Sequence, residues 1–425
     1  MSRPTTLAGW LAYLETLHPQ SIALGLDRVR AVHERLHKVI ACPVVTVTGT
    51  NGKGSTCAML EAILCSAGYR TGLYTSPHLL RYNERVRILG RAIGDAELLA
   101  AFDAVEDART AAQPAIPLTY FEFGTLAALW LFAGSSLDAL VLEVGLGGRL
   151  DAVNLIDADV AVLTSVALDH TEYLGATRDA IGREKAGIFR TGRPAICAEP
   201  HLPASVIEHA RAIGAPVVQI GRDYGFTDEQ TQWKYWGPGG ERFGLPFPAL
   251  RGAYQLANAA SVLAILDLLR GPLPVSGGAI RDGLLTVELP ARFQVLPGRP
   301  TTVLDVAHNP HAARTLASAL GAMGYYPETF AVWGMLGDKD LRGVAEELKA
   351  RIDHWNIARV PGPRGADAAA LRGALINAGI NASAIRVFGD VGEALSAARE
   401  SADEADRIVV FGSFLTVAAA LGLKE

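Results

Sequence analysis

The sequence predicts an α/β protein with two domains, each built on a mostly parallel sheet. Strand-like apolar segments alternate with helical segments along most of the chain, which is the pattern of parallel sheets. The chain has 425 residues, more than one typical core accommodates. A glycine-rich turn that contains a lysine, residues 49–55, joins a predicted strand to a predicted helix, as in nucleotide-binding domains.

Composition and charge limit the classes of function. Half of the residues are hydrophobic, a fifth are charged and 44 are glycine, which is typical of soluble globular α/β proteins. The net charge of −5 argues against a general nucleic-acid binder but leaves room for a basic pocket that takes an anionic substrate. The four cysteines lack C-x-x-C spacing, so we expect free buried thiols in a reducing compartment. With no secretion signal and no apolar stretch long enough for a bilayer, we expect a cytoplasmic protein that does not associate with membranes.

The central prediction is a phosphate-binding loop. Residues 44–48 are β-branched and predict a buried strand, and residues 56–64 predict a helix. The turn between them reads G-x-x-G-K-G-S, so its free backbone N–H groups and the helix N-terminus would attract an anion. The spacing departs from the usual G-x-x-x-x-G-K-[ST], and an ordinary glycine turn is the alternative. The predicted nucleotide-binding residues of the loop are Gly49, Thr50, Asn51, Gly52, Lys53, Gly54 and Ser55.

Other segments complete the predicted first domain. Residues 7–40 have helical periodicity, which Pro19 should interrupt. A second parallel strand, residues 70–75, leads into Ser76-Pro77-His78, at the sheet edge where open α/β sheets bind ligands. Residues 222–250 mix aromatic residues with glycine and proline, which predicts a small antiparallel insertion whose aromatic residues pack in a core.

Two positions, Glu143 and the Asp169-His170 pair, are candidates for metal chemistry, and a lysine lies in a charged cluster after them. Glu143 lies in an apolar strand, where an unpaired carboxylate is costly to bury, and a bound Mg²⁺ would remove that cost. Hydrogen bonds alone are the alternative. Asp169-His170 follows a strand at the same sheet edge, although a capping aspartate with a structural histidine is the default interpretation. Lys185 lies in a charged cluster, and lysines in such positions usually face solvent.

The C-terminal part predicts a second, separate parallel-sheet domain. From about residue 298, strands and helices alternate as far as a strand at 407–411. We therefore expect domains at residues 1–296 and 297–425. Polar residues again follow the strands of this second domain, namely Asp305, His308, Asn309, the run Asp338-Lys339-Asp340, and Ser413.

Taken together, these segments resemble the folylpolyglutamate synthase family of the Mur-ligase superfamily, and most closely its bifunctional bacterial members. The resemblance extends over nearly the whole chain. It implies a P-loop Mur-ligase-like ATPase domain with a small β insertion, followed by a Rossmann-like glutamate-ligase domain. The segments that carry the resemblance are Gly49–Ser55, Ser76–Leu79, Thr119–Phe123, Glu143–Asp151, Leu168–Thr171, Arg183–Ile188 and Asp305–Pro310.

The resemblance implies a defined reaction with small-molecule partners. ATP would phosphorylate the carboxylate of dihydropteroate or the γ-carboxyl of a folate. The amine of L-glutamate would then attack the acyl phosphate, which gives an amide, ADP and phosphate. Two Mg²⁺ ions would assist, because phosphoryl transfer depends on positioning and charge neutralisation. By analogy with the family we expect a monomer.

The resemblance also implies roles for individual residues. Thr50 to Lys53 would bind the ATP phosphates, Asn258 the adenine, Arg292 the phosphates and Asp305 the ribose. Ser76 and Glu143 would ligate one Mg²⁺, and His170 the second ion.

Further implied roles concern catalysis and the acceptor substrate. Lys185 matches a lysine that relatives carry in N6-carboxylated form, and only a neutral amine reacts with CO₂. His308 and Ser413 are candidates for the acyl-phosphate or glutamate region. Relatives often have an acidic residue where this chain has Ala23. The implied pterin-site residues are Ser21, Ile22, Ala23, Leu24, Thr119, Tyr120, Phe121, Glu122, Leu150, Asp151 and Ala152.

Two other functions were weighed against this one. A peptidoglycan-type amino-acid ligase would use the same loop but needs an N-terminal domain for a large sugar nucleotide, and the nucleotide strand already begins at residue 44. A nucleotide-dependent switch or scaffold has no use for Glu143, His170 and Lys185 together. It also predicts no amino-acid-stimulated ATP hydrolysis.

Overall fold

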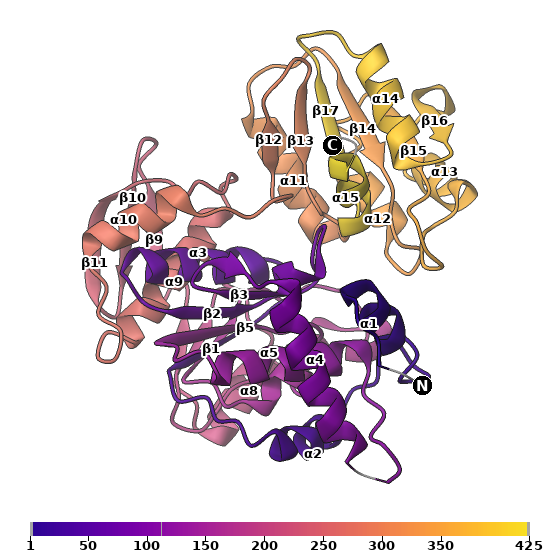
Figure 1. The fold of residues 1–425 in the computed structure, drawn as a ribbon. Helices are drawn as coiled ribbons and strands as arrows, with labels where there is room; N and C mark the ends of the chain where they lie inside the picture. The colour runs from indigo at the N-terminus through magenta and orange to yellow at the C-terminus, as the bar shows by residue number, and fades with distance from the viewer. Residues whose placement is uncertain (1–2, 112, 423–425) are drawn as a thin grey trace. The chain divides into compact units, whose positions relative to one another are not determined.

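The structure, a computed structural model, describes residues 3–111 and 113–422, which form two compact units (Figure 1). The first unit contains the residues up to Ala249 together with Gln255–Val287. The second contains Leu250–Tyr254 and the residues from Glu288 onwards. From Glu288 the chain stays in the second unit, and strand β12 (Gln294–Leu296) pairs there with strand β13 (Thr301–Leu304).

The first unit is built on an eight-stranded sheet with the order β4-β3-β2-β5-β1-β6-β7-β8. Strand β1 (Val44–Thr48) lies between β5 (Ala139–Glu143) and β6 (Val160–Leu163), and both pairings are parallel. These three strands are buried along their whole length, which explains their continuous apolar sequences. The remaining strands are β2 (Thr71–Tyr74), β3 (Val86–Ile88), β4 (Arg91–Ala92), β7 (Ala195–Cys197) and β8 (Val217–Gln219).

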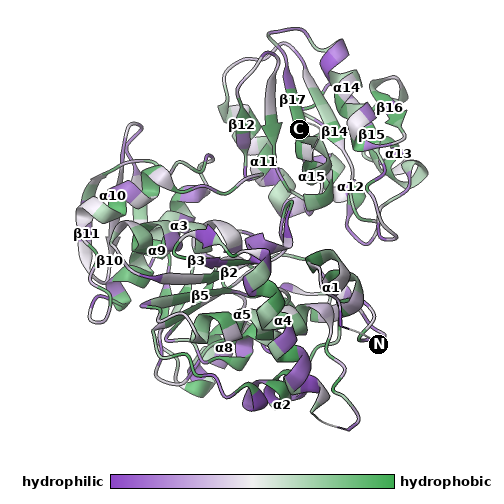
Figure 2. Ribbon diagram, in the orientation of Figure 1, coloured by the Kyte–Doolittle hydropathy of each residue, from purple (hydrophilic) through white to green (hydrophobic). Residues whose placement is uncertain are grey.

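Helices cover the sheet of the first unit. Helix α5 is coloured as hydrophobic over most of its length in Figure 2, and its buried residues include Phe123, Leu126 and Phe132. The helices of this unit are α1 (Leu7–Leu14), α2 (Asp27–Leu36), α3 (Lys53–Ser66), α4 (Asp95–Thr110), α5 (Tyr120–Ala133), α6 (Thr171–Leu174), α7 (Arg178–Ala186), α8 (Ala204–Ile213), α9 (Gln255–Leu268) and α10 (Gly277–Thr286).

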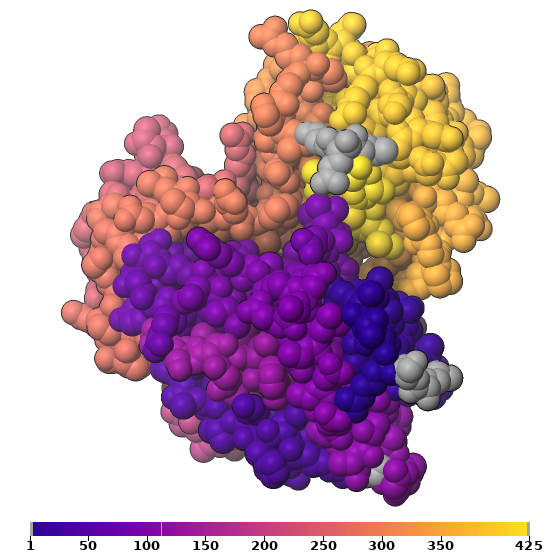
Figure 3. All heavy atoms as spheres, viewed as in Figure 1, coloured from indigo at the N-terminus to yellow at the C-terminus, as the bar shows by residue number. Residues whose placement is uncertain are grey.

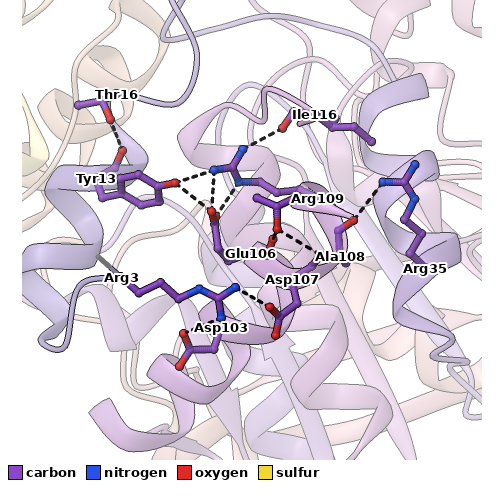
Figure 4. Close-up of polar contacts among 11 residues, drawn as sticks. Arg3, Tyr13, Thr16, Arg35, Asp103, Glu106, Asp107, Ala108, Arg109 and Ile116 are labelled. Carbon is purple, nitrogen blue, oxygen red and sulfur yellow. Dashed lines mark hydrogen bonds and ion pairs between the residues drawn. The ribbon is translucent and has the colours of Figure 1, made fainter. Parts of the chain in front are cut away.

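Helix α1 is held against α4 by a partly buried polar network (Figure 4) and by an aromatic contact. The Tyr13 hydroxyl donates to Glu106 Oε1 at 2.9 Å, and Arg109 Nη2 donates to the same hydroxyl at 2.6 Å. Trp10, which is fully buried, packs against Phe102 with ring centroids 5.7 Å apart. These contacts hold α1 against the rest of the unit, and α1 belongs to the darkest atoms in Figure 3. They thereby position the start of the loop that leads from α1 to α2.

The predicted insertion is confirmed as a three-stranded antiparallel sheet. It consists of β9 (Gly225–Asp228), β10 (Trp233–Gly237) and β11 (Gly240–Leu245). Tyr224, Trp233 and Tyr235 are fully buried, as the predicted core packing requires, whereas Phe243 is 59% exposed.

The second unit contains a six-stranded sheet with the order β12-β13-β17-β14-β15-β16, in which only β12 is antiparallel. Trp333, Trp355 and Phe411 are buried at its centre. The other elements are α11 (Pro310–Ala322), β14 (Thr329–Trp333), α12 (Leu341–Leu348), β15 (His354–Ala358), α13 (Ala368–Asn377), β16 (Ile385–Phe388), α14 (Val391–Ser401), β17 (Arg407–Phe411) and α15 (Phe414–Gly422).

The two-unit α/β architecture confirms the predicted fold class. The four cysteines are free, as expected, although only Cys57 and Cys197 are fully buried. In the part of the chain that the structure describes, no helix is long and apolar enough to cross a membrane.

Candidate active site

The predicted phosphate loop lies between β1 and α3, at the carboxyl end of the central strand (Figure 1). Gly49 and Gly52 have φ values of 154° and 88°, which favour glycine over residues with a side chain. Gly52 is also the N-cap of α3, so the first N–H groups of that helix border the loop. The Lys53 amine donates to the carbonyl oxygens of Gly49 and Thr50 at 2.9 and 3.3 Å. The loop therefore places a cation and a helix N-terminus together.

The segment that follows strand β6, residues 164–165, holds this loop through hydrogen bonds. Thr50 N–H donates to the Ser165 carbonyl, and Asn51 N–H donates to the Ser165 hydroxyl, both at 2.9 Å. The Thr164 hydroxyl donates to the Asn51 carbonyl at 2.7 Å. A Cβ atom at Gly49 would lie 1.8 Å from Thr164 Oγ1, so this position admits only glycine without rearrangement. Sequence reasoning did not identify Thr164 and Ser165 as supports of the loop.

Helix α9 also contacts the loop. Asn258 is 7% exposed, and its Oδ1 lies 2.8 Å from the position that a Cβ of Gly52 would occupy. Gln255 bonds to Asn258 and donates from Nε2 to the Ser55 hydroxyl at 3.3 Å. The structure thus brings Asn258, predicted to contact adenine, beside the phosphate loop. The Ser55 hydroxyl is buried and held by Gln255, whose sequence position gave no signal of this role.

The structure brings Ser76 and Glu143 together, as expected of a shared metal site. Ser76 follows β2 and Glu143 ends β5, the neighbouring parallel strand. Ser76 N–H donates to Glu143 Oε2 at 3.2 Å, and Glu143 is only 5% exposed. A buried carboxylate and a hydroxyl are hard oxygen donors that suit Mg²⁺, which completes its shell with water and phosphate oxygens. These two residues therefore fit the implied ion.

His170 lies after β6, in the left-handed region with a φ of 52°, and caps the short helix α6. Asp169 Oδ1 accepts the His170 N–H at 2.9 Å, but the N-cap position of α6 is His170 and no side-chain hydrogen bond caps this helix, so Asp169 does not act as a helix cap. Among the residues that the structure describes, no cluster of three or more histidine, cysteine or carboxylate side chains has a metal-binding arrangement. The assignment of His170 to a second ion stays a prediction.

Lys185 is buried, contrary to the usual exposure of lysines in charged clusters. It lies near the end of α7 and is 4% exposed. Burial lowers the pKa of its amine to about 7, with a further contribution from the charge of Lys53, while Asp169 and Asp151 act in the opposite direction. A large fraction of Lys185 is therefore neutral near pH 7, and this is the form that N6-carboxylation requires.

The three loops predicted to bind the pterin lie together. Gly25 N–H donates to the Leu150 carbonyl at 3.3 Å, which joins the first loop to the third. Arg28 Nη2 donates to the Ala23 carbonyl at 2.6 Å and to Glu122 Oε1 at 2.7 Å, which joins the first loop to the second. Arg28 was not among the predicted residues. Its helical position and distant partner left no sequence signal.

Aromatic and acidic side chains occupy the same region. The Phe121 ring lies over Gly145, where a Cβ would approach it to 2.6 Å. Asp151 accepts the N–H groups of Leu146 and Val153 at 2.8 and 3.1 Å. Burial raises the pKa of the Asp151 carboxyl to about 7, against the opposing effect of these backbone donors.

The predicted site residues of the second unit gather at the carboxyl ends of β13 and β17. Asp305 accepts the N–H groups of Phe293 and Ala307, both at 2.8 Å, and its burial raises the pKa of the carboxyl. The Arg292 guanidinium lies 4.9 Å from the Phe414 ring centroid. The candidate His308 donates from Nδ1 to the Val306 carbonyl at 2.8 Å.

Ser413 has a structural function in the second unit. Its hydroxyl accepts the Thr416 N–H at 3.0 Å and contacts the Thr416 hydroxyl at 2.7 Å. Ser413 thereby satisfies an N–H group at the start of α15. Its suggested contact with glutamate stays a prediction.

Comparison with protein families defines the class of protein to which this fold and site belong. The Mur ligase middle domain matches residues 47–266, and the Mur ligase glutamate ligase domain matches residues 291–414. The phosphate loop and the Ser76–Glu143 pair fall within the first of these domains, and Arg292 and Asp305 fall within the second. The chain is therefore a Mur-type ligase in fold and domain content.

Individual relatives narrow the class. The dihydrofolate synthase/folylpolyglutamate synthase of Escherichia coli K12 is 46% identical over 413 residues, 97% of this chain and 94% of the relative. The solved complex of E. coli FolC with DHPP and ADP superposes with a TM-score of 0.93 at 45% identity, covering 99% of this chain and 98% of that one. The solved structure of a bifunctional folylpolyglutamate synthase/dihydrofolate synthase with Mn, AMPPNP and L-glutamate bound superposes with a TM-score of 0.90 at 47% identity. The superposition covers 99% of this chain and 98% of that one. The chain belongs to the dihydrofolate synthase/folylpolyglutamate synthase family.

Proposed function

We propose that the chain is an ATP-dependent ligase that joins L-glutamate to dihydropteroate, forming dihydrofolate, and to the γ-carboxyl of folates. The observation that carries this proposal is the arrangement of the first unit. There, the phosphate loop and the Ser76–Glu143 pair lie at the carboxyl ends of neighbouring parallel strands, and hydrogen bonds join the three acceptor loops to one another. Relatives solved with ADP and DHPP, and with Mn, AMPPNP and L-glutamate, support the same substrates.

The reaction follows from the groups in the site. An oxygen of the acceptor carboxylate bonds to the γ-phosphorus of ATP, and the bond from that phosphorus to the bridging oxygen breaks as ADP leaves. The glutamate amine then bonds to the acyl carbon, phosphate departs with the electrons of the C–O bond, and the amine proton passes to solvent. Lys53 and the N–H groups of the loop would neutralise the phosphates. Ser76 and Glu143 would hold Mg²⁺, which stabilises the charge on the transferring phosphoryl group.

We also propose that Lys185 is N6-carboxylated and that His170 ligates a second ion. Burial and the low pKa of Lys185 favour reaction of the neutral amine with CO₂. The product is an anion, which relieves the repulsion between Lys185 and Lys53. Incubation with carbon-13-labelled bicarbonate should produce a carbamate resonance that Lys185→Met lacks. Equal spectra from the two proteins would contradict the modification.

The proposed activity is tested by ADP release with Mg-ATP and L-glutamate, with dihydropteroate and tetrahydrofolate offered in separate reactions. Glutamate-dependent turnover with both acceptors is expected. Turnover with one acceptor would restrict the enzyme to that reaction, and turnover with neither would refute the proposal. A monomer in light scattering is the expected oligomeric state, and we expect the enzyme to act in the cytoplasm.

A further inference from the structure

A buried arginine that the proposed reaction has not used lies in the first unit. Arg85 is 9% exposed and ends the short 3₁₀ helix Tyr82–Arg85. Its Nε donates to His78 Nδ1 at 2.9 Å. The guanidinium carbon lies 5.1 Å from the Tyr82 ring centroid and 5.5 Å from that of Tyr120. The charge of Arg85 thus faces neutral groups.

Arg85 has no negatively charged partner in the described part of the chain. No ion pair there involves Arg85, whereas the nearby Arg81 and Arg87 pair with Asp95 and Glu61. The carboxylate of the adjacent Glu84 instead accepts the backbone N–H groups of residues 79–81 at 2.6–2.9 Å. Burying a cation without an anion is costly, and two tyrosine faces offset only part of this cost. The arrangement suits an anion supplied by a ligand.

The position of Arg85 identifies the part of the ligand that it would meet. Its carbonyl accepts the N–H of Thr75 at 2.9 Å, so its backbone lies beside the segment that carries Ser76. Its side chain lies over Tyr120, which belongs to the second acceptor loop. Arg85 therefore connects the two regions: its backbone bonds to the residue before Ser76, and its guanidinium lies over a residue of the second acceptor loop.

The acceptor must span these same two places. Its pterin end would occupy the three loops, while its carboxylate must reach the phosphoryl group next to Ser76 and Glu143. A guanidinium presents paired N–H donors that match a carboxylate. The flanking tyrosine rings would also provide apolar surface for a flat aromatic ring.

We infer that Arg85 binds the carboxylate of the acceptor and holds it for phosphorylation, in a subsite completed by His78, Tyr82 and Tyr120. This inference rests on the proposed function. Arg85 would act on the reacting group itself, since the carboxylate that it binds is the one that attacks ATP. His78 would act through Arg85, as a positioning residue that fixes the guanidinium at Nε.

The alternative is that Arg85 only packs the loop between β2 and β3 through its two tyrosine contacts. The two interpretations differ in the effect of removing the ligand's carboxylate. If Arg85 binds that group, a neutral replacement should weaken only ligands that carry the carboxylate. If Arg85 only packs the loop, the replacement should weaken ligands with and without the carboxylate equally.

The test measures the dissociation constants of two ligands, dihydropteroate and its analogue with hydrogen in place of the carboxylate. The proteins are wild type, Arg85→Gln, Arg85→Lys and the control Arg81→Gln, whose side chain is 70% exposed in the same loop. Arg85→Gln should weaken dihydropteroate binding by about 10- to 100-fold, the range for charge-assisted hydrogen bonds. It should weaken the analogue by less than about 2-fold. Arg85→Lys should give an intermediate loss, and Arg81→Gln should match wild type.

Each outcome decides the inference. Equal losses for both ligands in Arg85→Gln would overturn the carboxylate subsite while glutamate-dependent turnover of dihydropteroate by wild type keeps the proposed function. Equal affinity of wild type for the two ligands would overturn it without any variant, which covers a variant that fails to fold. Failure of wild type to bind dihydropteroate or turn it over would overturn the inference and the dihydropteroate activity together.

Discussion

Replacement of Arg28 by alanine should both destabilise the first unit and weaken acceptor binding. Arg28 Nε donates to both carboxylate oxygens of Glu122, at 3.2 and 3.3 Å, and Nη2 donates to Glu122 Oε1 and the Ala23 carbonyl. The Glu122 side chain is 5% exposed and that of Arg28 is 28% exposed. Without Arg28, the buried carboxylate keeps its bond from Thr119 N–H at 2.7 Å but has no cation.

The magnitude follows from this partial burial. Removing one partner of a fully buried ion pair costs about 3–5 kcal/mol. Because Arg28 is partly exposed, water can enter the space that alanine leaves and solvate Glu122 in part. We therefore expect a loss of about 2–3 kcal/mol in the free energy of unfolding. The Michaelis constant for dihydropteroate should also rise, because Arg28 joins two of the three acceptor loops.

Urea unfolding followed by circular dichroism measures the stability change, and steady-state kinetics measures the Michaelis constants. Arg30→Ala is the matched control on the same helix, since Arg30 pairs with Asp27 and both side chains are at least half exposed, at 53% and 102%. Its effect should stay within about 0.5 kcal/mol. Equal stability of the Arg28→Ala and Arg30→Ala proteins would refute the reasoning, as would an unchanged Michaelis constant for dihydropteroate.

Three further predictions concern the site and the packing. Glu143→Gln should keep the melting temperature near that of wild type but reduce turnover by about two or more orders of magnitude, and wild-type turnover at matched Mg²⁺ would contradict the metal role. Turnover should fall as pH decreases through about 7, since protonated Lys185 cannot react with CO₂. Added bicarbonate should raise turnover most near that pH. A pH profile of turnover that does not depend on bicarbonate would count against carboxylation of Lys185. Gly283→Ala should lower the free energy of unfolding by about 1–3 kcal/mol, because the new Cβ would lie 2.5 Å from Ile63 Cα on α3. The control Gly278→Ala, whose Cβ would have no contact closer than 3.7 Å, should leave the melting temperature nearly unchanged.

The sequence was sufficient to predict elements and motifs that depend on neighbouring residues. The phosphate loop between β1 and α3 is local, because glycine spacing and the adjacent helix determine it. The sheet edge that carries Ser76 and Glu143 also followed, since parallel strands align their carboxyl ends.

Features that depend on distant partners could not be predicted in this way. Arg28 forms hydrogen bonds with Glu122, which lies 94 residues away in the sequence, and Gln255 forms one with Ser55, which lies 200 residues away. Lys185 showed the same limit, since its neighbours in sequence are charged while its surroundings in the fold exclude water. Strand β12 was likewise not predicted, because no local signal distinguishes it from the preceding segment and it is defined by its pairing with β13.

The electrostatics of the first unit explain why such a site suits anionic substrates. Burial lowers the pKa of Lys185, and the charge of Lys53 lowers it further, so the two amines disfavour each other's positive charge in the ligand-free site. Arg85 is a further buried basic residue, and no ion pair involves it among the residues described. Phosphate groups and a substrate carboxylate would supply the missing negative charge, so the charges that make the empty site costly are the ones that favour ligand binding. Substrate binding should therefore stabilise this unit beyond the contacts that each ligand makes, because it also removes repulsion within the protein.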